Sequence, residues 1–432
     1  MTNILQYILK ILAKIILWRH KPKVVAITGS VGKTSAKEAV YRVLRRHFKT
    51  RRNIKNYNNE IGVPLTILGS ETGGNSVWRW FKIFLKALAA ALWDKNYPEI
   101  LILEMGIDKP GDMKYLMSFI PVKVAVMTAI GQFPSHIEFF PEREKLVEEK
   151  ALLINSLPAD GLAVLNYDDL SVRMMRDNLP EKVSAIQYGF GEGADLEIAN
   201  YQLKIGDLEK GDFGISFKID YLGSAVPIRL PKVLGRQCAS VAAAAASVGV
   251  FFGLNLVDIS RELVKYRSLP GRTKLIRGIK NTWIIDDSYN ASPASVSAAL
   301  DILQEISVSK ADSEGDEKVF RRRIAILGDM LELGNDTEAG HREIGKKAAS
   351  TADLLFTVGE RARFISDEAR HRGMPKENIF EFSSSQKAGL TVQEKIASGD
   401  IILIKGSRFM RMENIVREIM AEPRKAGKLL VH

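Results

Sequence analysis

A short glycine-rich segment carries the clearest chemical signal in the sequence. Residues 27–35 read Ile-Thr-Gly-Ser-Val-Gly-Lys-Thr-Ser. Glycines allow backbone N–H groups to surround phosphate oxygens, and a helix that starts beside them adds the positive end of its dipole. We predict that Lys33 neutralises the β- and γ-phosphates of a nucleotide and that the Thr34 hydroxyl binds Mg²⁺. The predicted phosphate-binding residues are Gly29, Ser30, Val31, Gly32, Lys33, Thr34 and Ser35.

The spacing of this segment departs from the standard P-loop. Ile27 stands where that motif has its first glycine, so the loop reads G-x-x-G-K-T. A structural turn is the alternative interpretation. The position of Gly-Lys-Thr-Ser directly between an expected strand and an expected helix favours phosphate binding.

Glu104 is a second candidate for chemistry, because it ends the apolar run 100–103. A carboxylate at the C-terminal end of a parallel strand points into the crevice where such sheets bind ligands. Oxygen ligands of this kind suit Mg²⁺. The alternative is a carboxylate at the edge of the core that pairs with a lysine.

The elements around these residues indicate a doubly wound α/β domain. Residues 24–28 form a β-branched run, and residues 34–47 have the pattern of a helix. Further apolar runs, separated by helical stretches, are typical of buried parallel strands. These runs are Ile100–Leu103, Val124–Met127 and Leu162–Leu165.

The pattern changes twice further along the chain. Alternation between residues 185 and 230 predicts short antiparallel strands, and an alanine-rich helix is expected at 239–248. The residues Leu-Pro-Gly-Arg at 269–272 mark a domain boundary. We therefore expect an N-terminal helical segment (1–22), a P-loop central domain (23–268) and a Rossmann-like C-terminal α/β domain (269–432). Strands of the last are expected at 283–285, 324–327, 354–358 and 401–404, with a mobile polar loop at 308–319.

Two helices are unusually apolar. Residues 4–18 place their polar residues on one face, and the run is shorter than the roughly 20 residues that span a bilayer. This helix either lies in a membrane interface, with the basic residues 19–23 near headgroups, or packs on protein. Residues 77–93 form the second helix, for which buried packing is favoured over a second interfacial surface.

Composition limits the remaining classes of protein to which the chain could belong. The chain has 432 residues, a net charge of +11 and one cysteine, Cys238. A single cysteine excludes an internal disulfide and a cysteine-built zinc site, and it fits a reducing cytoplasm. The basic residues are spread along the chain without the aromatic interleaving of nucleic-acid modules, so no nucleic-acid partner is expected.

Five further motifs give a specific resemblance. From about residue 21 to about 418 the chain resembles the Mur ligase family, which has this short P-loop. Within the family it looks closest to the ligases that add D-alanyl-D-alanine to UDP-N-acetylmuramoyl-tripeptide. The motifs are Asn-Tyr-Asn-Asn-Glu-Ile-Gly-Val-Pro (56–64), Glu-Met-Gly with Gly-Asp-Met (104–106, 111–113), Asp-Asp-Ser-Tyr-Asn-Ala-Ser-Pro (286–293), Gly-Asp-Met-Leu-Glu-Leu-Gly (328–334) and Lys-Gly-Ser-Arg (405–408).

The resemblance implies roles for particular residues. Lys33, Glu104, His136 and Lys150 are expected to be catalytic, and Thr34, Glu104, His136 and Lys150 to hold Mg²⁺. Lys150 matches a lysine that CO₂ carbamylates in the family, with Lys145 as the nearby competitor. Asn166, Asp168 and Asp169 are site-adjacent or cap loops. Arg272, Asp287, Tyr289 and Asn290 are expected at ATP, and Asn58, Asn59, Lys405, Ser407 and Arg408 at the other substrates.

The implied activity joins a carboxylate, activated by ATP as an acyl phosphate, to an amine. We expect a cytoplasmic monomer that acts on peptide and nucleotide-sugar substrates in peptidoglycan precursor synthesis. Two departures from the family pattern stand out. Only about 22 residues precede the central domain where relatives have a uridine-binding domain, and Gly-Arg-Gln-Cys (235–238) replaces a frequent His-Asn. A lipid-linked acceptor at the inner face of the membrane, or a non-catalytic nucleotide-binding membrane scaffold, remains an alternative.

Overall fold

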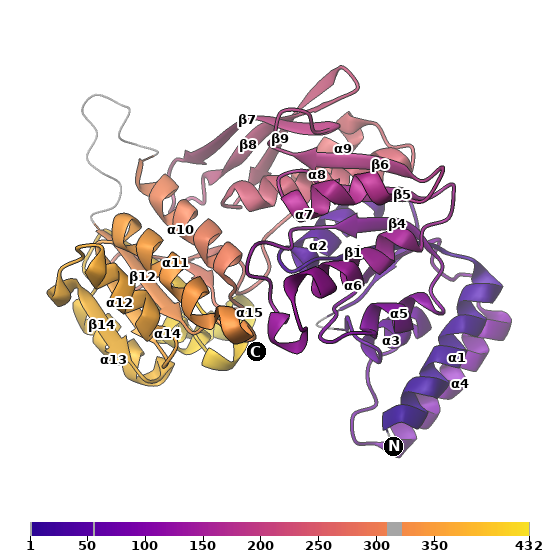
Figure 1. Ribbon diagram of the computed structural model, residues 1–432, viewed down its shortest axis with the longest axis horizontal. Coiled ribbons are helices and arrows are strands. Elements are labelled where there is room, and N and C mark those ends of the chain that lie inside the picture. The colour runs from indigo at the N-terminus through magenta and orange to yellow at the C-terminus, as the bar shows by residue number, and fades with distance from the viewer. Residues whose placement is uncertain (1, 55–56, 309–321, 432) are drawn as a thin grey trace.

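The computed structural model describes residues 2–54, 57–308 and 322–431 and contains two β-sheets, each with helices on both faces (Figure 1). The polar loop expected at 308–319 lies outside the described residues apart from residue 308. The predicted α/β class, with a mostly parallel P-loop domain followed by a second α/β domain, is confirmed.

The first sheet has nine strands in the order β2-β3-β1-β4-β5-β6-β7-β8-β9. It is parallel from β2 to β7 and antiparallel from β7 to β9. Its strands are β1 (Lys23–Thr28), β2 (Thr50–Arg52), β3 (Ile100–Glu104), β4 (Val122–Met127), β5 (Leu162–Asn166), β6 (Ser184–Gly189), β7 (Leu196–Ile205), β8 (Phe213–Tyr221) and β9 (Ser224–Pro231).

Two hydrophobic cores enclose this sheet. Side chains of a strand alternate between its faces, so Val24 and Ala26 of β1 enter one core while Val25 and Ile27 enter the other. The first core is covered by α1 (Thr2–His20), α3 (Gly62–Leu68), α4 (Val77–Trp93), α5 (Asp112–Met117), α6 (Arg143–Asn155) and the short α7 (Leu170–Arg173). The second is covered by α2 (Lys33–Leu44), α8 (Arg236–Phe251) and α9 (Leu256–Leu263).

The second sheet has the order β10-β11-β15-β12-β13-β14 and is parallel except for β10. Its strands are β10 (Lys274–Arg277), β11 (Trp283–Asp287), β12 (Arg322–Gly328), β13 (Leu354–Val358), β14 (Ile379–Phe382) and β15 (Asp400–Lys405). Helices α10 (Pro293–Val308), α11 (Thr337–Thr351) and α12 (Arg363–His371) cover one face, and α13 (Ser385–Lys395), α14 (Glu413–Ile419) and α15 (Ala426–Leu429) cover the other. Short 3₁₀ turns are η1 (Ile137–Phe139), η2 (Met174–Asn178), η3 (Gly334–Asp336), η4 (Lys376–Asn378), η5 (Arg408–Met410) and η6 (Pro423–Lys425).

The two apolar helices at the N-terminal end of the chain lie against each other at the edge of the molecule (Figure 1). Helix α1 packs one face on the first core, where Leu9, Ala13 and Ile16 are fully buried. The prediction that residues 77–93 are buried is wrong for most of α4, because only a narrow stripe of Ile83, Ala87 and Ala91 is covered. Within the described residues, no helix is both long and apolar enough to cross a membrane.

Candidate active site

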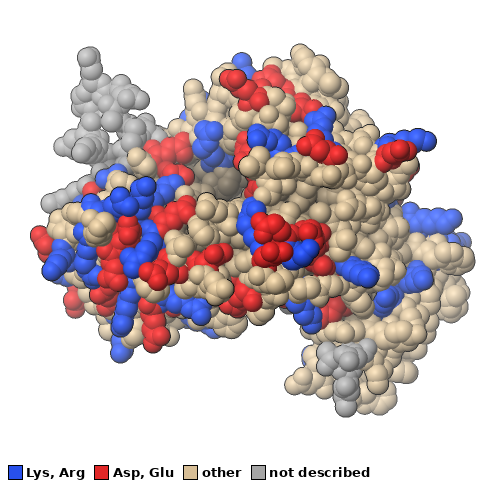
Figure 2. Space-filling model, viewed as in Figure 1, with Lys and Arg blue, Asp and Glu red and all other residues tan. Residues whose placement is uncertain are grey.

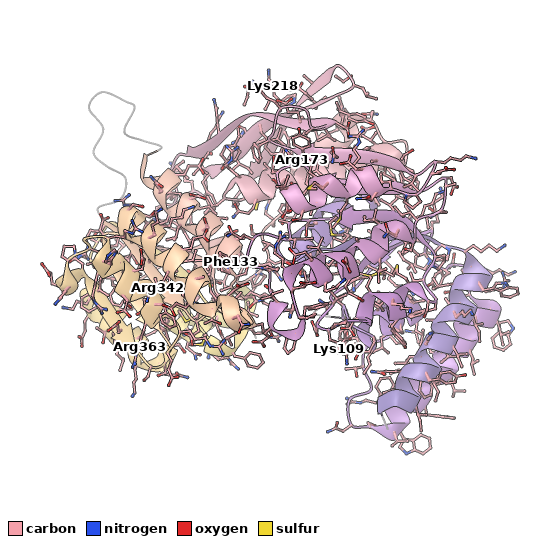
Figure 3. All side chains as sticks on the ribbon, viewed as in Figure 1. Lys109, Phe133, Arg173, Lys218, Arg342 and Arg363 are labelled. Atoms are coloured by element: carbon pink, nitrogen blue, oxygen red, sulfur yellow. The ribbon has the colours of Figure 1, made fainter. Side chains whose placement is uncertain are left out.

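A cavity of about 920 Å³ lies between the two domains. Its walls come from the loops that follow the carboxyl ends of strands in both sheets, which is where open α/β sheets bind ligands. The loop after β4 bridges the domains, since Phe133 packs on the core of the second sheet (Figure 3). The predicted site residues that line the cavity are Ser30, Val31, Gly32, Lys33, Thr34, Ser35, Asn58, Glu104, His136, Arg272, Asp287, Tyr289, Asn290, Lys405, Ser407 and Arg408.

The glycine-rich loop is held against the loop after β4. Gly29 has φ +140°, and a Cβ at this position would lie 2.1 Å from Thr128 Oγ1, so the close approach requires glycine. The amides of Ser30 and Val31 donate to the carbonyl of Ala129 at 2.7 and 3.1 Å. These two amides are therefore engaged within the protein, which leaves the first turn of α2 as the main source of free N–H donors.

The side chains of this loop fit a phosphate group. The Ser30 hydroxyl is buried without a hydrogen-bond partner. Lys33 Nζ folds back onto the loop and donates to the Gly29 carbonyl at 2.7 Å. Burial lowers the pKa of Lys33, while Glu104 opposes that shift. An anion at this position would satisfy the hydroxyl and stabilise the charged lysine.

Glu104 is positioned by three partners. Its Oε1 accepts from Thr34 Oγ1 at 3.1 Å and from Asn58 Nδ2 at 3.2 Å. The backbone of Glu104 is clamped by the Asn53 side chain, which exchanges two hydrogen bonds with it. A hydroxyl and a carboxylate that already meet are suitable oxygen ligands for Mg²⁺, so this donor set fits the predicted cation.

Sequence reasoning did not single out Lys37, although it lies one turn after Lys33. Its side chain is 2% exposed, and Nζ lies 3.6 Å from Glu104 Oε2 and 3.6 Å from Glu38 Oε1. A lysine four residues after the P-loop lysine on one helix face was the available signal. Lys37 compensates the buried charge of Glu104 and holds its second oxygen.

Replacing Lys37 by methionine is expected to lower the free energy of unfolding by about 3 kcal/mol, because removal of one member of a buried pair leaves the other charge without compensation. Urea denaturation measures this change. The double variant Lys37→Met/Glu104→Gln removes the leftover charge and should recover part of the loss. Equal stability of the wild type and Lys37→Met would contradict the pairing.

Lys150 lies beneath the phosphate loop. Its side chain is 1% exposed, and Nζ lies 3.4 Å from the Gly29 carbonyl. Burial, followed by the nearby positive charge of Lys33, holds the pKa of Lys150 well below its usual value. The competitor Lys145 is exposed on the same helix and pairs with Glu148 at 2.8 Å, so only Lys150 is close to the loop.

His136 joins the two domains. It adopts a left-handed backbone, with φ 70°, at the start of η1. Its Nδ1 lies 2.8 Å from Glu332 Oε2, which follows β12 in the second domain, and 3.8 Å from Asp108 Oδ1. The contact with His136 lowers the pKa of Glu332. Glu332 lies inside the motif at 328–334 but was not predicted as a site residue.

Arg272 brings the second domain to the phosphate loop. Its Nη2 donates to Thr34 Oγ1 at 3.0 Å, and its guanidinium lies 4.3 Å from the ring centre of Tyr289. Arg408 lies over the same ring at 5.6 Å. Two cationic groups of the C-terminal domain thus line the cavity beside the Tyr289 ring, which is a suitable arrangement for an anionic ligand.

Asp287 and Lys405 form a buried pair at the carboxyl ends of two neighbouring strands. Lys405 Nζ lies 2.5 Å from Asp287 Oδ2 and donates to the Asn290 carbonyl at 2.9 Å. The other carboxylate oxygen of Asp287 accepts from the Thr273 amide at 3.0 Å. The pair therefore connects the linker between the domains to the predicted substrate-binding motif at 405–408.

Other predicted residues have structural tasks. Asn59 does not line the cavity, and its Oδ1 accepts from the Gly62 amide at 2.9 Å at the start of α3. Asp168 accepts from the amides of residues 190 and 191, and Asp169 from those of residues 130 and 131. Both aspartates therefore fix loops, whereas Asn166 lines the cavity.

The predicted metal ligands do not form a closed cluster. Among the described residues, no group of three or more His, Cys, Asp and Glu side chains could hold a metal ion. An unmodified Lys150 amine does not fit a Mg²⁺ site, whereas a carbamate there would supply the missing oxygen ligands. The donor set therefore fits Mg²⁺ through Thr34 and Glu104 and needs the modification, or the nucleotide, to complete it.

The fold and cavity define a two-domain P-loop protein with a nucleotide site closed by the second domain. Comparison with known protein families identifies the family of this chain. The family description "Mur ligase middle domain" matches residues 27–78 and 83–249, and "Mur ligase, glutamate ligase domain" matches residues 271–408. The chain belongs to the Mur ligase family.

Relatives share this organisation over almost the whole chain. The UDP-N-acetylmuramoyl-tripeptide--D-alanyl-D-alanine ligase of Bacillus subtilis is 29% identical over 95% of this chain and 79% of its own length. The ligase of the same name from Escherichia coli is 27% identical over 92% and 76%. The crystal structure of MurF ligase from Thermotoga maritima in complex with ADP has a TM-score of 0.74 and 25% identity, over 96% of this chain and 84% of that chain.

Proposed function

We propose that this chain is an ATP-dependent ligase that couples D-alanyl-D-alanine to the tripeptide of UDP-N-acetylmuramoyl-tripeptide. One observation carries the proposal: the phosphate loop, the Glu104–Thr34 pair and the C-terminal residues Arg272 and Glu332 meet in one interdomain cavity. The Bacillus subtilis and Escherichia coli relatives bear the name of this activity, and the Thermotoga maritima structure contains ADP.

The proposed reaction has two steps. An oxygen of the tripeptide carboxylate forms a bond to the γ-phosphorus, and the bond from that phosphorus to the β–γ bridging oxygen breaks, so ADP leaves. The amine nitrogen of D-alanyl-D-alanine then attacks the acyl carbon, phosphate leaves with the bonding electrons, and the nitrogen loses a proton. Closure of the two domains would exclude water from the acyl phosphate.

The residues of the chain divide this work. Lys33 and the first turn of α2 bind the phosphates, while Arg272 approaches from the second domain to stabilise developing charge. We propose Thr34, Glu104, His136 and carbamylated Lys150 as the Mg²⁺ ligands. Bound Mg²⁺ would neutralise phosphate charge and orient the transferring group. We propose that Lys405, Ser407 and Arg408, which line the cavity, bind the amine or its carboxylate.

Phosphate release from ATP and Mg²⁺ tests the function. UDP-N-acetylmuramoyl-tripeptide and D-alanyl-D-alanine are added separately and together, and mass spectrometry follows the product. Release that requires both substrates, together with a pentapeptide product, is the expected result. An intact protein that binds ATP but releases no phosphate with both substrates would reject this substrate pair.

A lipid-linked acceptor is the second candidate. The apolar helix α1 packs on α3, and the loop before α3 places Asn58 on Glu104. An acceptor carried on a lipid would therefore reach the site beside an apolar surface. The same assay with a lipid-linked tripeptide separates the two candidates. We further propose that the enzyme is a monomer of the cytoplasm.

A further inference from the structure

We propose that helices α1 and α4 form a docking surface for an anionic lipid bilayer. The proposal concerns where the protein works and is independent of its reaction. It rests on the shape, composition and charge of one exposed surface, called here the helix-pair surface and made of the exposed residues of 4–19 and 77–93.

The helix-pair surface is apolar to a degree that folded protein surfaces rarely are. Three tryptophans stand near helix ends, and Trp18, Trp78 and Trp93 are 74, 75 and 74% exposed. Between them the exposed apolar residues recur every three or four positions, which forms one stripe along each helix. The stripes consist of Ile4, Tyr7, Ile11, Ile15 and Trp18 on α1, and Val77, Phe81, Leu85, Leu88 and Leu92 on α4.

The two helices are neighbours on one projecting edge of the molecule. His20 at the end of α1 contacts the carbonyl of Ala90 near the end of α4 at 3.0 Å, so the carboxyl ends of both helices lie together. In Figure 2 the projection formed by these helices is mostly tan, with blue Lys and Arg groups beside it. Large exposed apolar side chains gathered on two neighbouring helices in this way indicate a protein or membrane interaction site.

The positive charge of the helix-pair surface indicates that its binding partner is an anionic bilayer. The sequences of α1 and α4 contain six Lys and Arg and no Asp or Glu. On α4 the basic residues Arg79, Lys82 and Lys86 follow one another at spacings of three and four, which places them along one border of the apolar stripe. Lys21 extends the positive charge beyond α1, and it is exposed.

This combination matches a helix that lies in the interface plane. Such helices bury an apolar face at the boundary between headgroups and acyl chains and place Lys and Arg among anionic headgroups. Tryptophan is enriched at that depth because its ring is apolar and its N–H is polar. A protein partner of the same surface would need acidic groups facing the basic border, and a second copy would place two basic borders together.

Vesicle flotation tests the proposal with the full-length protein. The vesicles contain phosphatidylglycerol and phosphatidylethanolamine, and vesicles of phosphatidylcholine alone serve for comparison. We expect flotation with the anionic vesicles, weaker binding as salt rises because the charges are screened, and a blue shift of tryptophan fluorescence. Absence of flotation with anionic vesicles overturns the proposal.

Two variants separate the apolar and the charged contributions. Trp18→Ser/Phe81→Ser/Trp93→Ser should abolish flotation. Lys14→Gln/Arg79→Gln/Lys82→Gln should weaken the partition coefficient by about a hundredfold, since each basic residue near an anionic surface contributes about fivefold. The matched controls lie on other exposed surfaces and should bind as the wild type does. They are Leu222→Ser/Leu390→Ser and Lys204→Gln/Lys218→Gln/Lys376→Gln.

Other binding partners of the helix-pair surface would give different experimental results. All replaced side chains are exposed, so unchanged thermal unfolding and ATP affinity show that each variant is folded. Light scattering without vesicles reports self-association. A dimer that the tryptophan variant dissociates, with no flotation of the wild type, overturns the proposal in favour of a second copy. Flotation that is equal on anionic and neutral vesicles and insensitive to salt overturns the role of charge.

Discussion

Replacement of Lys150 by alanine is expected to reduce product formation by about a thousandfold, the scale for loss of one preorganised charge-stabilising group, while ATP still binds. Lys150 is buried under the phosphate loop, and its lowered pKa leaves more of the amine neutral near pH 7. Only a neutral amine attacks CO₂, so the shift favours the carbamate that would bind Mg²⁺. Initial rates and labelling of the protein with ¹³C-bicarbonate, read by NMR, measure both effects.

The lowered pKa of Lys150 also determines how its carbamylation depends on pH. A lysine with a lowered pKa is neutral above that pKa and charged below it, so carbamylation should be lost as the pH falls through the lowered value. Added bicarbonate should raise the rate most on the acidic side. Lys150→Ala should lack this response, and acetate that enters the space left by the side chain should restore part of the rate.

Lys145→Ala is the matched control, because Lys145 lies on the same helix but is exposed and paired with Glu148. It should keep wild-type rate and bicarbonate response. If Lys150→Ala retains wild-type activity, or if Lys145→Ala loses it, the assignment of the modified lysine is wrong.

The sequence was sufficient for the parts of the fold that depend on local pattern. The run at 24–28, the glycine loop and the following helix predicted β1 and α2, because a buried parallel strand and an amphipathic helix have distinct periods. Strands β10 and β14 were not predicted. Each has four residues and forms one edge of the second sheet, where pairing with the neighbouring strand rather than intrinsic propensity determines the structure.

Predictions were wrong or missing where tertiary contacts determine the burial and the partners of a residue. The sequence of α4 predicts a buried helix, but the body of the protein buries only the narrow stripe of Ile83, Ala87 and Ala91. Asn59 was expected at a substrate, but it does not line the cavity, and its side-chain oxygen accepts from the nearby Gly62 amide. Asp168 was expected to be site-adjacent or to cap a loop, and it accepts from the amides of residues 190 and 191. The charge partners Lys37 and Glu332 were not found, because the contacts of Lys37 with Glu104 and of Glu332 with His136 join residues far apart in sequence.

Replacement of Arg272 by alanine is expected to lower kcat by about a thousandfold or more, the scale for an arginine that stabilises a transferring phosphoryl group. Arg272 stands at the start of the C-terminal domain, and its guanidinium donates to Thr34 while it faces Tyr289. The turn that carries it is fixed, since the Gly271 amide donates to Asp286 and the Gly271 carbonyl accepts from Tyr289. Steady-state rates and calorimetric ATP affinity measure the effect.

The conservative variant distinguishes chemistry from packing. Arg272→Lys keeps a positive charge but loses the planar fork and the ring contact, so it should recover little of the rate. Arg277→Ala, which removes an exposed arginine on β10 that pairs with Glu209, is the control and should keep wild-type kcat. A rise in KM for ATP at unchanged kcat in Arg272→Ala would mean that Arg272 binds ground state and transition state equally. The interdomain contact would then serve nucleotide binding, and the charge that develops on the phosphoryl group would be left to Lys33 and the metal.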